Sequence, residues 1–120
     1  MKEQNTQTTA KEVVLAFVSA ITKEDFKTAH SLANDDMRFD GVLGSRNGAD
    51  DYFASMEKLK FKFDVKKAFA EGNDVCLLYN VDMGGKTIFC CGWYTVKNGK
   101  ISSLKVVFDP RPVLEGSSKN

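Results

Sequence analysis

Residues 87–108, TIFCCGWYTVKNGKISSLKVVF, read as two β-strands joined by a tight turn. Asn98-Gly99 stands between two segments rich in β-branched and aromatic residues. Asn-Gly in this setting is the strongest short signal for a two-residue hairpin, because both turn positions require a positive φ. The stretch therefore predicts an antiparallel hairpin, and the neighbouring segments can be placed outward from it.

Two further strands are predicted on the N-terminal side of this hairpin. Residues 75–83, VCLLYNVDM, precede a Gly84-Gly85 turn, and residues 61–69 precede an EGND turn. Residues 61–69 alternate between apolar and polar side chains, as expected of a strand with one buried face. The four segments together predict an antiparallel meander. The apolar members of the first strand are Phe61, Phe63, Val65 and Phe69.

Three helices are predicted before the meander. Thr9 and Glu12 have the spacing of a capping box, and apolar residues then recur at helical intervals to about Thr22. A short second helix is expected from residue 26 to the polar NDD cluster at 34–36. Residues 37–44, MRFDGVLG, read as a strand, and Asn47 is a candidate N-cap for the third helix. That third helix places Tyr52, Phe53, Met56 and Leu59 on one face.

The element order, helix-helix-strand-helix and then four strands, predicts an α+β fold whose helices pack on one face of the sheet. Because successive side chains of a strand point to opposite faces of the sheet, a second set of apolar side chains is expected on the face away from the helices. Such an exposed patch is typical of an interface, so a homodimer formed through the sheet is expected. The outer set comprises Leu78, Phe89, Cys91, Trp93 and Val107.

Composition excludes several classes of protein. The chain has 120 residues, 42% of them hydrophobic, and a formal net charge of +1. A chain of this length and composition suits one domain, which is expected over residues 10–114 with tails at 1–9 and 115–120. A net charge near zero, with no stripe of basic residues, does not favour nucleic-acid binding. No segment resembles a membrane span or a signal peptide, so a cytoplasmic location is expected. Three cysteines without CxxC spacing suggest neither a disulfide framework nor a zinc site.

A family resemblance covers nearly the whole predicted domain. Its signal is the element order together with RFDGVLG at 38–44, NGK at 98–100 and VVFDPRP at 106–112. In these features the chain resembles the nuclear transport factor 2-like superfamily, and within it the SnoaL-like and ketosteroid-isomerase-like proteins. The resemblance implies a cone-shaped half-barrel with helices enclosing an apolar cavity, and usually a dimer. Its members include isomerases, cyclases, dehydratases, epoxide hydrolases and binding modules, so chemistry does not follow from the fold.

The resemblance makes Asp40 a candidate general base, because it falls where ketosteroid isomerases carry theirs. The family's helix-one tyrosine reads as Phe17 here and its second aspartate as Gly92, so steroid isomerase activity is not expected. Tyr79 and Tyr94 lie on the expected pocket face and are the candidate hydroxyl donors. Two interpretations of Asp40 remain open: a carboxylate that faces the pocket, or one that caps the turn at Gly41.

The expected function is binding of a small, largely apolar ligand. If the protein is an enzyme, the expected reaction is proton transfer through Asp40, as in an isomerase or cyclase, with neither cofactor nor metal. The alternative is a dimeric protein-interaction module whose cavity is incidental. The expected pocket wall comprises Phe17, Ile21, Met56, Phe63, Leu77, Val81, Cys90, Val106 and Phe108.

Overall fold

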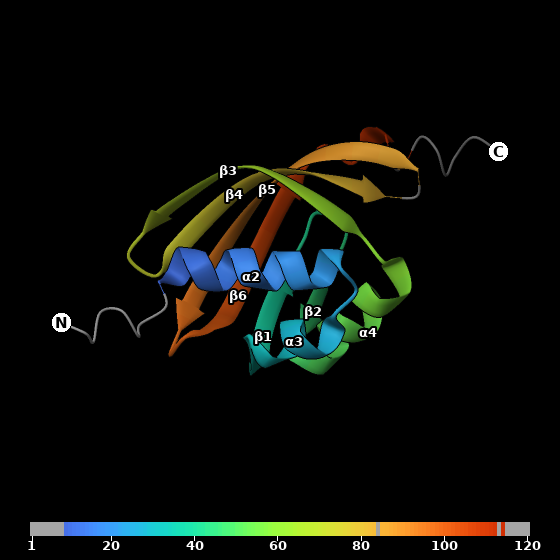
Figure 1. Cartoon of the computed structure of the whole chain (residues 1–120). Coiled ribbons are helices and arrows are strands. Elements are labelled where there is room, and N and C mark those ends of the chain that lie inside the picture. The colour runs from blue at the N-terminus through green and yellow to red at the C-terminus, as the bar shows by residue number, and fades with distance from the viewer. Residues whose placement is uncertain (1–8, 84, 113, 115–120) are drawn as a thin grey trace.

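The computed structural model describes residues 9–83, 85–112 and 114, and it forms an α+β fold in which helices cover one face of a curved sheet (Figure 1). Of the tails expected at 1–9 and 115–120, residues 1–8 and 115–120 lie outside the described residues, whereas Thr9 is the N-cap of the first helix. The elements are, in order, α2 (Ala10–Thr22), α3 (Phe26–Ser31), β1 (Ala33–Asp40), β2 (Ser45–Asn47), α4 (Ala49–Leu59), β3 (Lys62–Glu71), β4 (Asp74–Met83), β5 (Lys86–Lys97) and β6 (Lys100–Phe108).

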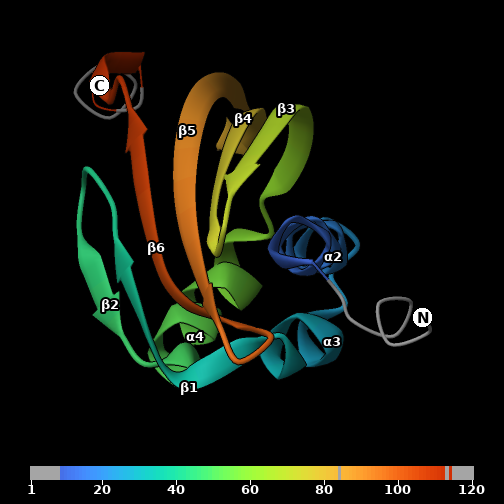
Figure 2. The same ribbon diagram turned by 90° about the vertical axis from the view of Figure 1, so that its left-hand side faces the viewer.

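The strands form one six-stranded sheet in the order β2-β1-β6-β5-β4-β3. The predicted meander from β3 to β6 is confirmed, since each strand pairs antiparallel with the next. β1 pairs parallel with β6, and β2 adds an antiparallel edge beyond it. The sheet curves strongly, so that β1 and β2 stand apart from β3 and β4 across its concave side (Figure 2). This curvature leaves room for a pocket between the two ends of the sheet.

The predicted start of the first helix is confirmed. The Thr9 hydroxyl accepts a hydrogen bond from the Glu12 amide at 3.1 Å, and the Glu12 carboxylate accepts one from the Thr9 amide at 3.0 Å. This reciprocal pair satisfies two donors that a helix N-terminus otherwise leaves unbonded. The helix ends at Thr22, as its apolar pattern predicts.

Three predicted boundaries were wrong. The strand expected over residues 37–44 ends at Asp40, and residues 41–44 form the loop that joins β1 to β2. The NDD cluster at 34–36 does not end α3 but lies within β1, because pairing with β6 extends that strand back to Ala33. The third helix begins after Gly48, which has a φ of 92°, and not after Asn47. Asn47 belongs to β2, where its side-chain oxygen accepts a hydrogen bond from Arg38 at 2.7 Å.

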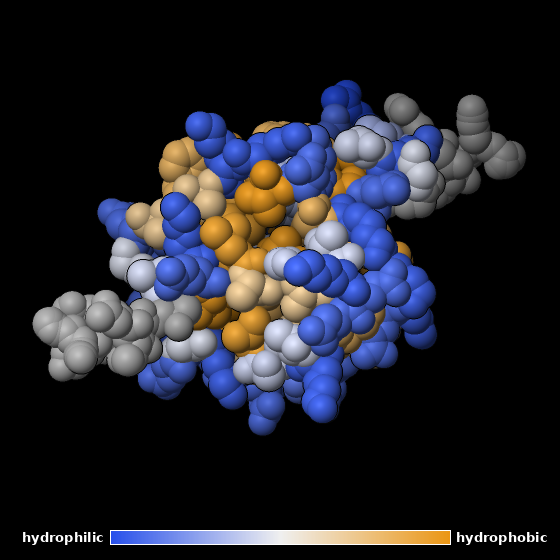
Figure 3. Space-filling view, viewed as in Figure 1, coloured by the Kyte–Doolittle hydropathy of each residue, from blue (hydrophilic) through white to orange (hydrophobic). Residues whose placement is uncertain are grey.

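The core lies between α2 and the concave face of the sheet. Phe17 is fully buried and its ring meets those of Tyr52, Phe53 and Tyr94 at centroid distances of 6.2, 5.9 and 6.3 Å. Apolar side chains form a patch on the face that α2 crosses, surrounded by hydrophilic residues (Figure 3). The predicted inward face of the meander is confirmed for Leu77, Tyr79, Val81, Cys90, Tyr94 and Leu104, which are all buried.

The predicted alternation along β3 fails after Val65. The register against β4 shifts between Val65 and Lys67, so one extra residue enters the strand. Side chains beyond this point change faces. Ala68 therefore packs against the core, whereas Phe69 is 56% exposed and not buried as expected.

The opposite face of the sheet carries the expected apolar side chains. Phe89, Trp93 and Val107 are 58%, 50% and 59% exposed. The thiols of Cys76 and Cys91 lie 3.4 Å apart on this face as free cysteines. We call the set Leu78, Phe89, Cys91, Trp93 and Val107 the outer apolar face.

Candidate functional site

A cavity of about 230 Å³ opens between the concave face of the sheet, α4 and the loop that joins β1 to β2. Its wall is mostly apolar and aromatic, with the side chains of one arginine, one serine and three tyrosines as the polar groups. The curvature of the sheet and the position of α4 create this space. The lining residues are Phe39, Gly41, Val42, Leu43, Gly44, Arg46, Tyr52, Ser55, Met56, Leu59, Phe61, Phe63, Tyr79, Val81, Tyr94, Leu104, Val106 and Phe108.

Three tyrosines from different elements converge on the cavity: Tyr52 from α4, Tyr79 from β4 and Tyr94 from β5. Burial raises the pKa of all three phenols well above the ordinary value, because an apolar environment disfavours the phenolate. Each therefore carries its proton at neutral pH. The wall thus offers neutral hydroxyl groups and no phenolate.

The predicted donors Tyr79 and Tyr94 both line the cavity, and Gly92 allows their rings to pack. A Cβ atom at Gly92 would lie 3.0 Å from Cε1 of Tyr94 and 3.2 Å from Cε1 of Tyr79. An aspartate there would have to displace both rings. A larger side chain at position 92 would thus require the two tyrosine rings that line the cavity to shift.

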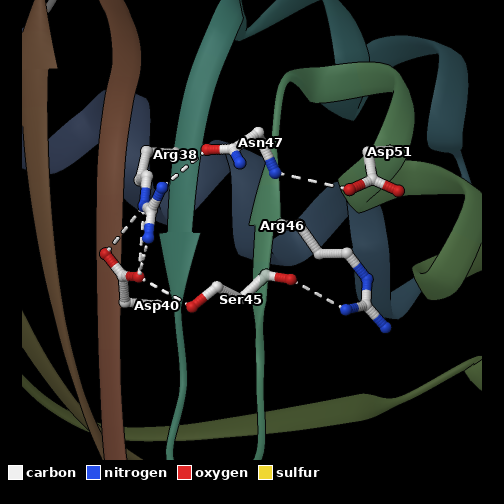
Figure 4. Close-up of polar contacts among 6 residues, drawn as sticks. All are labelled: Arg38, Asp40, Ser45, Arg46, Asn47 and Asp51. Carbon is white, nitrogen blue, oxygen red and sulfur yellow. Dashed lines mark hydrogen bonds and ion pairs between the residues drawn. The ribbon is translucent and has the colours of Figure 1, made fainter.

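Asp40 does not line the cavity. Phe39 lines it, and the alternation along β1 directs Asp40 to the other side of the sheet. There the carboxylate accepts hydrogen bonds from Nη2 of Arg38 and Oγ of Ser45, each at 2.8 Å (Figure 4). Neither earlier interpretation describes it, since its partners are these two side chains instead of a ligand or the turn at Gly41.

Asp40 is expected to titrate below the ordinary range of aspartates. Hydrogen bonds from Arg38 and then Ser45 lower the pKa of the Asp40 carboxyl. A lowered pKa in the folded state stabilises the fold above the unfolded value, and this contribution is lost as the pH falls through the folded value. Carboxyl-carbon NMR should therefore show Asp40 titrating below about 3.9, and Arg38→Gln should move it upward.

Asp109 supplies the matched control for this titration. It pairs with Arg111 through Nη2 at 2.6 Å and Nε at 2.9 Å, and this pairing lowers its pKa to about 2. The Arg38→Gln substitution should leave Asp109 unchanged, and Arg111→Gln should shift Asp109 alone. An Asp40 pKa above the ordinary value would contradict the placement of this carboxylate.

Arg46 is a cavity residue that the sequence analysis missed. It pairs with Phe39 across the β1–β2 hairpin, which places both side chains on the pocket side. Its Nε donates to Oγ of Ser55 at 2.9 Å and its Nη1 to the carbonyl of Ser45 at 2.8 Å. In a strand, Arg46 points to the opposite face from Ser45 and Asn47. The sequence alone does not show that these three residues form a strand, so this orientation was not predicted.

The residues predicted to form the pocket wall divide into two groups. Met56, Phe63, Val81, Val106 and Phe108 line the cavity. Phe17, Ile21, Leu77 and Cys90 do not line it and are buried in the packed core, which corrects their expected position. The reason is that the rings of Tyr52 and Tyr94 pack around Phe17 and lie between it and the open part of the cavity.

Over residues 9–83, 85–112 and 114, no group of three or more His, Cys, Asp or Glu side chains is placed to hold a metal ion. Within the same ranges no helix has the length and apolar character needed to cross a bilayer.

The sequence profile of the SnoaL-like domain matches residues 14–104, which is most of the chain. The chain belongs to the SnoaL-like family. It therefore also belongs to the nuclear transport factor 2-like superfamily, as the resemblance of its sequence implied. The comparison with curated proteins gave no match.

Solved structures show the same fold. A nuclear transport factor 2-like protein of unknown function from Cytophaga hutchinsonii shares 46% identity over 95% of this chain and 99% of its own, with a TM-score of 0.89. A protein from Kribbella flavida shares 26% identity over 93% and 96%, with a TM-score of 0.83. An LEH-like epoxide hydrolase from M. tuberculosis shares 22% over 89% and 87%, with a TM-score of 0.77, and that likeness concerns the fold alone.

Proposed function

We propose that this SnoaL-like protein binds a small, largely apolar molecule in the cavity under the curved sheet. The observation that carries the proposal is a cavity of about 230 Å³ whose wall is almost entirely apolar and aromatic. Ligand sites are typically concave, apolar and furnished with a few polar groups that orient the ligand. Because an apolar cavity of about 150 Å³ can already hold benzene, this one suits a bicyclic ring or a short alkyl chain.

The proposal is binding and not proton transfer. Among the residues that the structure describes, those that line the cavity include no carboxylate and no imidazole, and Asp40 lies on the far side of β1. A general base must come within hydrogen-bond reach of the proton that it removes. The three tyrosines are protonated at neutral pH, so they can donate hydrogen bonds to a ligand but cannot act as bases.

Binding of a neutral apolar dye, N-phenyl-1-naphthylamine, tests this proposal. We expect its fluorescence to rise saturably at one site per chain. Filling the cavity with Val106→Trp should weaken binding by about tenfold or more, because the new ring would occupy the ligand's place. The measurement is a fluorescence titration of the wild type and the variant, with folding checked by circular dichroism.

Val107→Trp is the matched control for this experiment. Val107 is adjacent in β6 but points to the outer apolar face, where it is 59% exposed. This substitution should change the affinity for the dye by no more than about twofold, because Val107 does not line the cavity. Equal weakening by both substitutions, or binding that does not saturate, would contradict a ligand site in the cavity.

We also propose that the outer apolar face joins two copies of this chain. Phe89, Trp93 and Val107 lie on the adjacent strands β5 and β6 and are at least half exposed. Large contiguous apolar patches usually mark an interface. Lys105 lies 5.6 Å from the centre of the Trp93 ring, and Asp74 accepts a hydrogen bond from the indole at 3.0 Å. Lys105 and Asp74 thus lie on the same face. In a two-fold symmetric dimer, Lys105 of each copy can pair with Asp74 of the other copy.

A further inference from the structure

We infer that the cavity recognises the carboxylate of a largely apolar monocarboxylic acid, and that Arg46 holds this group. The inference rests on the proposed function, since it names the chemical class of the molecule that the cavity binds. It is carried by the position of Arg46, by the charges around it and by the donors that it leaves free.

The side chain of Arg46 reaches the cavity from the β1–β2 hairpin and points away from the Arg38–Asp40 pair (Figure 4). It is half-buried, and two hydrogen bonds fix the plane of its guanidinium group. One runs to the hydroxyl of Ser55 in α4 and the other to the carbonyl of Ser45. The cation is therefore held in one orientation before any ligand arrives, which reduces the entropy cost of binding.

The charge of Arg46 is not compensated by a described residue. Arg38 and Arg111, the other arginines of the chain, are bonded through two nitrogens each to Asp40 and Asp109. For Arg46, no carboxylate among the residues that the structure describes lies within ion-pair distance. A half-buried cation at the edge of an apolar cavity favours an anionic partner, because the cavity wall supplies no counter-charge.

The free donors of Arg46 fit a planar anion. A guanidinium group has five N–H donors, and Ser55 and Ser45 take one each, from Nε and Nη1. The remaining hydrogens on Nη1 and Nη2 can form the fork that matches a carboxylate. Since Arg46 is the only cation among the described residues that line the cavity, a singly charged carboxylate is balanced there, whereas a doubly charged phosphate would not be.

The rest of the cavity wall indicates that the part of the ligand beyond the carboxylate is apolar. Aromatic and aliphatic side chains from α4, β3, β4 and β6 surround the space beyond Arg46. A ring or alkyl chain attached to the carboxylate would be buried against them at roughly 25 cal/mol per Å² of apolar surface. An acid with a second charged group would leave that charge without a partner in this wall.

The test compares 2-naphthoate with 2-naphthamide, which have nearly the same shape and differ in charge. Isothermal titration calorimetry at neutral pH should show naphthoate binding about 10- to 100-fold tighter to the wild type, as expected for hydrogen bonds to a charged group. Arg46→Met should remove this preference, because naphthoate loses a charge-assisted partner and its affinity therefore falls much further than that of naphthamide. Arg46→Lys should retain part of the preference, because it keeps the charge but loses the fork.

Ser55→Ala is a second variant that leaves the charge in place. Ser55 is a positioning residue, so its loss should reduce the preference for naphthoate while binding of naphthamide persists. This variant keeps the inference testable if Arg46→Met folds poorly. Folding of each variant is checked by circular dichroism.

The outcomes separate the inference from the proposed function. Equal binding of the two compounds to the wild type would overturn the role of Arg46 and leave an apolar binding pocket. A preference for naphthoate that persists in Arg46→Met would place the anion elsewhere and also overturn it. If neither compound binds the wild type while the dye also fails to bind, the proposed function itself falls.

Discussion

Replacing Phe17 with alanine is expected to lower the free energy of unfolding by about 3–5 kcal/mol, the range found when a large buried aromatic ring is removed from a core. Phe17 has no exposed surface, and its ring meets three other aromatic rings in the core between α2 and the sheet. Their packing closes the space between α2 and the sheet. The loss should be large because the strands and α4 cannot all move inward to fill the void.

Urea denaturation followed by circular dichroism measures this effect, and Phe69→Ala is the matched control. Phe69 is 56% exposed beyond the register shift in β3. Its removal should change the free energy of unfolding by about 0.5 kcal/mol or less, as is usual for surface positions. A loss below about 1 kcal/mol for Phe17→Ala would show that the ring is not a central part of the core.

Replacing Phe89 with lysine is expected to raise the dimer dissociation constant by about 30-fold or more, because a central interface residue typically contributes about 2 kcal/mol or more. Phe89 is 58% exposed in the folded chain, so the substitution should spare the fold itself. In the proposed dimer its ring is buried against the second copy, and two-fold symmetry would introduce a charge from each chain into the interface. Sedimentation velocity over a range of concentrations measures the change.

Ser19→Lys is the control for the added charge. Ser19 is exposed on α2, on the helical side of the molecule. This variant should dimerise as the wild type does. A wild type that remains monomeric at the highest concentration reached, or a Phe89→Lys variant that dimerises as well as Ser19→Lys, would contradict an interface at the outer apolar face.

The sequence predicts the positions of some key residues but not of others. The inward position of Phe17 and the outward position of Phe89 follow from helical and strand periodicity, and both are confirmed. The position of Arg46 could not be predicted in the same way. Its strand, β2, is three residues long and has no periodicity of its own, so its orientation depends on pairing with β1.

The position of Asp40 could have been predicted from its strand. The resemblance to ketosteroid isomerases made it a candidate base, and its strand was predicted. In the order Met37-Arg38-Phe39-Asp40, apolar and charged side chains alternate, so Asp40 shares a face with Arg38 and not with Phe39. Because the buried face of a strand takes its apolar side chains, this alternation already indicated that Asp40 faces away from the pocket.

The sequence by itself determined the local structure of this protein: the capping box at Thr9, the Asn98-Gly99 hairpin, the meander and the two-sided apolar pattern of its strands. These features depend on hydrogen bonds and backbone preferences among residues close together in the chain. Only the tertiary structure decided the parallel pairing of β1 with β6, the register shift in β3 and the cavity that Arg46 lines. Each of these arises where segments far apart in sequence meet, because packing and pairing between them, and not local preference, select one arrangement.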